Sequence, residues 1–263
     1  MIATENLELH VAHGCNLTCE SCSHYSNQNH KGILPLDQAD RWMAGWSQRL
    51  QPAVFSLLGG EPTLHPELAS FVPLVRRHWA TAHLRLVTNG LLLARHPNLP
   101  LAMRADPNCC LYLSIHHDSP AYQEHLRPAL LLLDRWQGEH GIRVVRYESH
   151  RNWTRRYHGS GAGMEPFADG QPRESWRNCP AKQCKQLHEG KLWKCGPLAY
   201  LPMQHAKYGL SERWRPYLAY EPLSPECSDE ELAAFCRREE EAYCGMCTAK
   251  PERMLLPLPL RAT

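Results

Sequence analysis

The chain has 263 residues, of which 43% are hydrophobic and 21% charged, and its formal net charge is +2. This length holds one sizeable core, or one core with a small appended module. The small net charge argues against a nucleic acid or an anionic membrane as partner. The N-terminus lacks the features of a signal peptide and no apolar stretch is long enough to span a bilayer, so we expect a cytoplasmic protein without membrane contact.

Strand and helix patterns alternate along the first 150 residues. In one helical pattern Trp42, Met43, Trp46 and Leu50 recur at helical spacing, and another ends at Gly141. We expect strands at residues 7–13, 53–59, 83–90, 109–117 and 142–149, and helices at 37–50, 66–79 and 121–141. This alternation predicts an α/β fold with a parallel sheet that binds ligands at the carboxyl ends of its strands.

The alternation stops near residue 150. Residues 151–178 are rich in glycine, arginine and aromatic residues, which is typical of a long functional loop. Residues 179–263 are rich in cysteine and predict short elements only. One of these is a helix at 228–242, which Ser228 and Glu231 begin with a capping box. We therefore expect three units, at 1–150, 151–178 and 179–263, the last ending in a proline-rich irregular tail.

Three of the twelve cysteines lie within the sequence HGCNLTCESC, at Cys15, Cys19 and Cys22. In a reducing compartment, clustered cysteines are metal ligands or redox groups rather than disulfides. Cys109 and Cys110, on an apolar strand, fit the role of small buried hydrophobes. Zinc sites usually take four ligands, whereas three thiolates in one tight loop suit three corners of a [4Fe-4S] cluster and leave one iron open.

The spacing of these cysteines resembles the radical S-adenosylmethionine (SAM) superfamily. The resemblance covers roughly residues 7–149 and implies a partial (β/α) barrel of about five parallel strands. It implies that Cys15, Cys19 and Cys22 hold a catalytic [4Fe-4S] cluster whose open iron binds SAM. In that family the reduced cluster cleaves SAM to a 5′-deoxyadenosyl radical, which abstracts hydrogen from the substrate. An external one-electron reductant, such as flavodoxin or ferredoxin, is then also implied.

A second motif, LLGGEPTLHPE, follows the second expected strand. Its glycines, Gly59 and Gly60, allow backbone to approach a ligand closely, and Glu61 supplies a carboxylate. The motif resembles the family segment that holds the methionine amino group of SAM. Asn89 and Ser114, at the ends of the third and fourth strands, are expected to contact the carboxylate or ribose of SAM. Each also fits a purely structural role: Asn89 as a turn residue and Ser114 as a small core residue.

One position departs from the family pattern. The residue before the third cysteine is usually aromatic and packs near the adenine, but here it is Ser21. We expect Tyr25 to take its place.

A second group of cysteines lies in the last third of the chain. Gly190 predicts a tight turn between two short strands, which would bring cysteines on both sides together. The group resembles a twitch domain, the shorter relative of the SPASM domain, and implies an auxiliary [4Fe-4S] cluster on Cys179, Cys195, Cys244 and Cys247. A structural zinc site on the same residues is the alternative. Cys184 is an alternate ligand, and Cys227 and Cys236 are expected bystanders.

The sequence contains fewer indications of the substrate. Arg146 and Glu148, at the end of the fifth strand, are our candidates for substrate binding, because arginine binds carboxylate or phosphate bidentately. A solvated surface is the alternative for such arginines.

Three functions remain open. The first is oxidation or epimerisation of a small polar molecule such as a sugar or aminocyclitol, since the architecture resembles the 2-deoxy-scyllo-inosamine dehydrogenases. The second is modification of a ribosomally made peptide, which would need a separate leader-binding partner because no such domain precedes the first strand. The third, of another class, is a non-catalytic zinc-binding interaction module.

Overall fold

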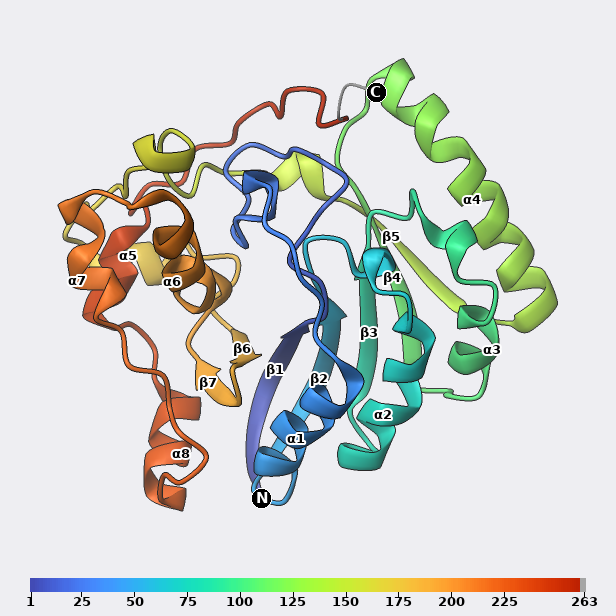
Figure 1. The fold of residues 1–263 in the computed structure, drawn as a ribbon, viewed down its shortest axis with the longest axis horizontal. Helices are drawn as coiled ribbons and strands as arrows, with labels where there is room; N and C mark the ends of the chain where they lie inside the picture. Colours follow the sequence, from blue (N-terminus) through green and yellow to red (C-terminus); the bar gives the residue numbers. More distant parts are fainter. Residues whose placement is uncertain (261–263) are drawn as a thin grey trace.

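The computed structural model describes residues 1–260, and a seven-stranded sheet with strand order β5-β4-β3-β2-β1-β6-β7 forms its centre (Figure 1). The first five strands are all parallel to their neighbours. They are β1 (Ile2–His10), β2 (Leu50–Leu58), β3 (His83–Thr88), β4 (Cys109–Ile115) and β5 (Arg143–Glu148). The α/β class and the five-strand parallel core expected from the sequence are confirmed.

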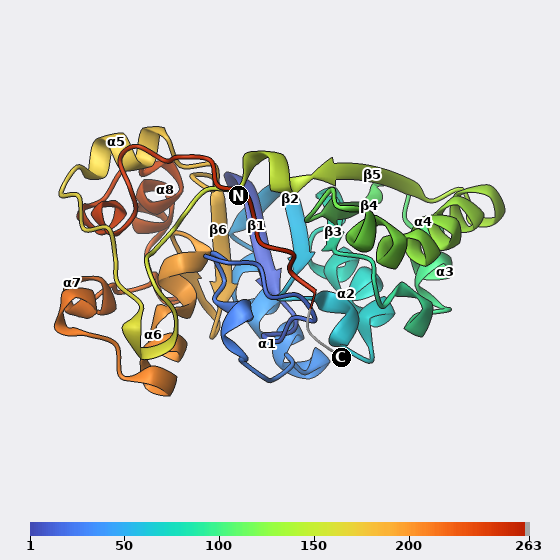
Figure 2. The same cartoon turned by 90° about the horizontal axis from the view of Figure 1, so that it is seen from above.

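Four helices connect these strands and cover one face of the sheet (Figures 1 and 2). They are α1 (Leu36–Ser47), α2 (Phe71–His78), α3 (Leu99–Arg104) and α4 (Pro120–His140). Helix α4 begins after Ser119, whose side chain accepts a hydrogen bond from the Tyr122 N–H, and ends at Gly141 with φ 66°. Both features are common helix boundaries, because serine satisfies a free N–H and glycine adopts the left-handed conformation without strain.

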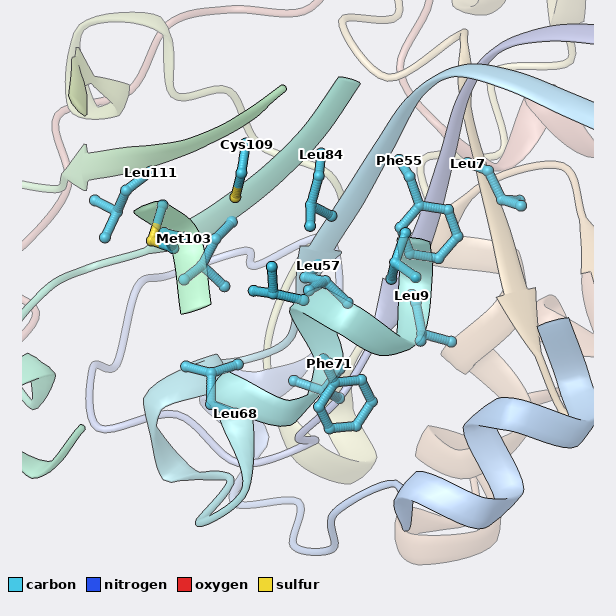
Figure 3. Close-up of a cluster of buried hydrophobic side chains, with 14 of the residues drawn as sticks. Leu7, Leu9, Phe55, Leu57, Leu68, Phe71, Leu84, Met103, Cys109 and Leu111 are labelled. Carbon is cyan, nitrogen blue, oxygen red and sulfur yellow. The ribbon is translucent and has the colours of Figure 1, made fainter. Parts of the chain in front are cut away.

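Alternate residues of the strands form the core beneath these helices (Figure 3). Leu7, Phe55, Leu84 and Leu111 of four neighbouring strands are fully buried and pack with Phe71 and other helical residues. Burial of one such side chain contributes roughly 1.5–3 kcal/mol to stability. Because side chains alternate along a strand, the residues in between lie on the opposite face of the sheet.

That opposite face is polar, and we call it the polar face. It carries, among others, Asn6, Glu8, His10, Ser56, Arg85, Tyr112 and Ser114, which share the register of neighbouring strands. Parallel strands are usually apolar on both faces because helices cover both. Charged and amide side chains on one face of a parallel sheet therefore indicate that this face is a site rather than a packing surface.

The C-terminal third extends the same sheet. β6 (Cys184–His188) pairs in parallel with β1, and β7 (Lys191–Trp193) returns antiparallel to β6. The turn between them contains Gly190 with φ 74°, as expected from the sequence. This hairpin continues the central sheet at the β1 edge, a placement that the sequence did not indicate.

The remaining helices are α5 (Pro172–Arg177), α6 (Gly196–Tyr208), α7 (Arg215–Leu218) and α8 (Asp229–Arg237). Helix α8 begins with the expected capping box of Ser228 and Glu231 but ends five residues before the expected residue 242. Helix α6 has 13 residues and was not expected. None of the helices within residues 1–260 combines the length and the apolar composition needed to cross a bilayer.

The tail that follows is irregular, as expected, but it is firmly docked. The Pro259 carbonyl oxygen accepts hydrogen bonds from the Thr18 N–H at 2.8 Å and from the Thr18 hydroxyl at 3.0 Å. Leu17 forms an isolated antiparallel bridge with Leu260. The tail therefore lies against the loop that carries the first three cysteines.

Candidate active site

The loop with the first three cysteines follows β1 and is fixed to the end of β2. The Gly60 N–H donates to the Ala12 carbonyl and the Glu61 N–H to the Gly14 carbonyl, both at 2.8 Å. A Cβ atom added at Gly59 would lie 2.6 Å from the Ala12 oxygen, and one at Gly60 would lie 2.2 Å from the Gly14 oxygen. The sequence suggested that these glycines let backbone approach a ligand. In the structure, they let the cysteine loop approach the end of β2.

A cavity of about 200 Å³ opens at the carboxyl ends of β1 to β4. It brings together most of the site residues expected from the sequence, namely Cys15, Cys19, Cys22, Gly59, Gly60, Glu61, Asn89 and Ser114. The sequence analysis did not identify other residues that line it, among them Ser23, His24, Asn27, His116 and Trp153.

Glu61 is buried at the wall of this cavity and held rigidly. Its Oε1 accepts hydrogen bonds from the Thr63 N–H and hydroxyl and from the Thr88 hydroxyl. Among residues 1–260, its Oε2 accepts only the Asn89 N–H, at 2.8 Å. Burial raises the pKa of Glu61, and these hydrogen bonds oppose the rise. Oε2 therefore retains capacity to accept a further donor from the cavity.

The Asn89 side chain reaches the cysteine loop. Its amide donates to Asn16 Oδ1 at 2.7 Å and lies 4.0 Å from Cys15 Sγ. The strand-terminating turn is present as well, because Asn89 Oδ1 accepts the Leu91 N–H. Asn89 thus serves both the turn and the site.

Two histidines control the environment of the thiols. Cys19 Sγ lies 3.4 Å from His116 Nδ1, and burial lowers the pKa of His116 to about 4. Burial, Cys22 and Cys15 raise the pKa of Cys19. Burial opposes ionisation of Cys22 too, but the hydrogen bond and charge of His24 outweigh it and lower the pKa of Cys22.

The three thiols at this cavity are the kind of ligand that holds an iron-sulfur cluster. The three thiols come from one loop and line one cavity. Within residues 1–260, no three histidine, cysteine or acidic side chains are arranged to hold a metal ion. The fit to a cluster therefore rests on the shared cavity and on the three thiols that one loop brings to it.

Residues 9–132 match the family model described as the Radical SAM superfamily. These residues form a radical SAM domain. The domain begins in β1 and ends within α4, so it contains the cysteine loop, Gly59 to Glu61, Asn89 and Ser114.

Several solved structures of low sequence identity are similar to this chain. BtrN in complex with AdoMet and 2-DOIA is similar with 15% identity and a TM-score of 0.51, over 96% of this chain and 98% of BtrN. Native anSMEcpe with bound AdoMet and Cp18Cys peptide has 18% identity and a TM-score of 0.42, over 54% of this chain and 42% of anSMEcpe. Streptococcus suis SuiB bound to S-adenosylmethionine has 16% identity and a TM-score of 0.38, over 55% and 41%. The chain thus spans less than half of anSMEcpe and SuiB. No curated protein sequence matches the chain.

Ser21 has a structural role in the radical SAM domain. It is buried, and its hydroxyl accepts the Arg156 N–H at 2.6 Å and the Tyr157 N–H at 3.2 Å. Beside it, the Trp153 indole donates to the Glu20 carbonyl at 2.8 Å. These hydrogen bonds therefore hold the segment after β5 against the cysteine loop.

Tyr25 lies away from the cavity that was expected to take the adenine. It is 1% exposed, its hydroxyl donates to the Pro197 carbonyl at 3.1 Å, and its ring centroid lies 5.4 Å from that of Tyr157. It does not line the cavity. Tyr25 packs instead between the cysteine loop and the start of α6.

Arg146 and Glu148 also lie outside the cavity. Arg146 forms an ion pair with Asp134 of α4 at 2.6 Å, so it points to the helix-covered face, and Glu148 pairs with Arg151 at 2.7 Å. Our prediction that Arg146 faces the site is therefore corrected. Tyr147, between them in the sequence, lines a second cavity on the polar face.

The later cysteines gather at a separate place. Cys179, Cys195, Cys244 and Cys247 line one small cavity of about 40 Å³. Burial raises the pKa of Cys195, and the three other thiols raise it further, which places all four close together. Trp176 lines the same cavity, and its indole N–H is buried without a hydrogen-bond partner among residues 1–260. Four thiols with an unpaired donor beside them fit a sulfur-rich group.

The other cysteines of the C-terminal third lie elsewhere. Cys184, at the start of β6, accepts a hydrogen bond from the Asn6 amide at 3.5 Å and does not line the cavity of the four thiols. Cys227 lies beside Arg49, and Cys236 packs against the main core.

Proposed function

We propose that the protein is a radical SAM enzyme that cleaves SAM reductively and abstracts hydrogen from a small polar molecule of sugar or aminocyclitol type. The substrate radical would then be oxidised or epimerised. The single observation that supports this most is the cavity in which the three thiols of one loop meet Glu61, Asn89 and Ser114.

Each part of this cavity has a role in the proposal. Cys15, Cys19 and Cys22 would hold a [4Fe-4S] cluster, which supplies the electron that cleaves SAM to a 5′-deoxyadenosyl radical. Glu61 would accept the methionine ammonium through Oε2, the oxygen with a single hydrogen bond. Asn89 and Ser114 would orient SAM against the loop, and the half-buried Trp153 would limit access of water on its side of the cavity.

The four later thiols would hold an auxiliary [4Fe-4S] cluster. The unpaired Trp176 N–H supports this role, because cluster sulfurs accept hydrogen bonds. A structural zinc ion on the same residues is the competing hypothesis. Electrons for the catalytic cluster would come from a flavodoxin or ferredoxin.

The space at the site supports a small substrate. The active-site cavity shares Ser23, His24 and Ser114 with a second cavity of about 330 Å³ on the polar face. Cavities of roughly 300–1,000 Å³ are typical of small-molecule sites. BtrN, whose fold resembles this chain over nearly its whole length, was solved with AdoMet and 2-DOIA.

The experiment is iron and sulfide analysis of the anaerobically reconstituted protein, combined with detection of 5′-deoxyadenosine after reduction with dithionite. We expect about eight irons per chain, falling to about four with no 5′-deoxyadenosine when Cys15, Cys19 and Cys22 are replaced by alanine. A Cys227→Ala/Cys236→Ala variant, which changes cysteines outside both sites, is the matched control. Iron without 5′-deoxyadenosine, or no iron at all, would contradict the proposed function.

A further inference from the structure

The cavity of about 330 Å³ on the polar face has an unusual distribution of charge. Glu8 of β1, Arg85 of β3 and Tyr112 of β4 line it, together with Tyr147 of β5. These residues lie deeper along the strands than the cysteine loop, and the cavity shares Ser114 with the active site above. We call it the inner chamber.

Glu8 presents a buried carboxylate to this chamber. It is 6% exposed, and its oxygens accept hydrogen bonds from the Asn6 amide at 2.9 Å and from the Gln186 amide. Gln186 is itself oriented by the Tyr200 hydroxyl at 3.0 Å. Within residues 1–260, Glu8 forms no ion pair. The Cys184 thiol is a further neutral hydrogen-bond partner of Glu8. A buried carboxylate is normally paired with a cation, so one that is held by two neutral amides and a thiol is prepared for a cation from outside.

Arg85 presents a positive charge to the same chamber. Its Nε and Nη2 donate to the Ser56 hydroxyl at 3.1 and 2.9 Å, and its guanidinium lies 5.1 Å from the centroid of the Tyr112 ring. Among the residues that the structure describes, no carboxylate pairs with Arg85, and its hydrogen bonds leave Nη1 available. The guanidinium is therefore oriented but not neutralised.

A chain of hydrogen bonds keeps the two opposite charges apart. Ser56 donates to Asn6 Oδ1 at 2.9 Å, and the Asn6 amide donates to Glu8. The order Arg85, Ser56, Asn6, Glu8 thus places a neutral hydroxyl and a neutral amide between the guanidinium and the carboxylate. Opposite charges that share a wall without forming a salt bridge are arranged to bind a ligand that carries complementary groups.

We propose that the inner chamber binds a small ring-shaped polyol with a protonated amine, the amine at Glu8 and a hydroxyl or anionic oxygen at Arg85. The proposal rests on the proposed function and narrows its substrate class to one that carries an amine, with the residues that would bind it. His24 also lines the chamber, and Cys22 and, more weakly, Glu8 raise its pKa. Within residues 1–260, however, no hydrogen bond or ion pair joins His24 to Glu8, so the carboxylate has no direct cationic partner. Tyr112 and Tyr147 provide the walls against which the ring would lie.

The test is isothermal titration of the anaerobically reconstituted protein with SAM present, using scyllo-inosamine and its neutral counterpart scyllo-inositol. These probes differ only in one amino group. We expect wild-type protein to bind the amine at least about tenfold more tightly, and Glu8→Gln to abolish that preference, because a hydrogen bond between charged groups is lost. Glu5→Gln is the matched control, since Glu5 is exposed on the same strand.

Formation of 5′-deoxyadenosine without substrate checks cofactor loading in the wild-type protein, and iron content together with the circular dichroism spectrum checks folding and cluster loading in Glu8→Gln. If the wild-type protein forms 5′-deoxyadenosine but binds neither probe, or binds both equally, the inner chamber does not select an amine and this inference is wrong. The same holds if Glu8→Gln keeps the preference. If the wild-type protein forms no 5′-deoxyadenosine, the proposed function fails instead.

Discussion

Gly60 lies against Gly14 so closely that a Cβ at position 60 would be 2.2 Å from the Gly14 carbonyl oxygen. The end of β2 and the cysteine loop are therefore one packed unit, and the loop cannot keep its position if Gly60 gains a side chain.

Replacement of Gly60 by alanine should displace the cysteine loop. Backbone atoms cannot rotate away as a side chain does, so we expect a loss of roughly 1–3 kcal/mol in the free energy of unfolding. Iron bound by the catalytic site should fall with it. Urea denaturation and iron analysis measure the two effects. Gly138→Ala is the control, because open space surrounds that position within helix α4, and it should be neutral or slightly stabilising.

Ser21→Ala should loosen the segment after β5. The N–H groups of Arg156 and Tyr157 lose their acceptor in a buried place, which costs roughly 1–3 kcal/mol. Hydrogen exchange of residues 153–157 should accelerate in the variant. Ser70→Ala, at an exposed serine without a capping hydrogen bond, should leave exchange and stability unchanged. Unchanged protection in Ser21→Ala would show that other contacts hold the segment.

Loss of one thiol from the second cysteine group should show which iron belongs to which of the two proposed metal sites. We expect Cys247→Ala to reduce iron from about eight to about four per chain while dithionite still yields 5′-deoxyadenosine. Cys184→Ala should leave the iron content unchanged, because Cys184 lies at the start of β6 away from the four thiols. An iron loss in Cys184→Ala equal to that in Cys247→Ala would overturn the assignment of ligands. Zinc in place of iron would make the site structural.

Stability should decrease as the pH falls from about 6.5 to about 4. Burial lowers the pKa of His188 from 6.5 to about 4, so in this range the unfolded chain binds a proton that the folded chain does not. The free energy of unfolding then falls by up to about 1.4 kcal/mol per pH unit for this group. Urea denaturation across the range should show a shallower slope for His188→Gln. His125→Gln, at an exposed position in α4, should keep the wild-type slope, and an unaltered slope in both variants would refute the effect.

The sequence predicted the radical SAM core well because its strands have one buried face and end at residues that commonly terminate strands. The phase of β5 was wrong for a physical reason. It is the edge strand, its residues Arg146, Tyr147 and Glu148 are all exposed, and no buried face fixes which of them faces the site. The direction in which each side chain of a strand points can be predicted from the sequence only where buried and exposed residues alternate along that strand.

Other features had weak or contrary signals. Helix α6 was missed because Pro197 and Pro202 interrupt a helical pattern, although the first lies in the first turn, where proline is tolerated. His116 stood beside Ser114 at the end of β4, where site residues were expected, but only the structure shows its contact with Cys19. His24 adjoins the cysteine loop without any spacing that would single it out.

The hydrogen bonds between Thr18 and Pro259 join residues 241 positions apart in the chain. On a ribosome, the strands and helices of the first half emerge and can pack long before residue 259 is made. The cysteine loop cannot complete its contacts until that residue has been synthesised and has left the exit tunnel. Final closure of the loop is therefore a late event, which follows the synthesis of every strand and helix that positions the three thiols.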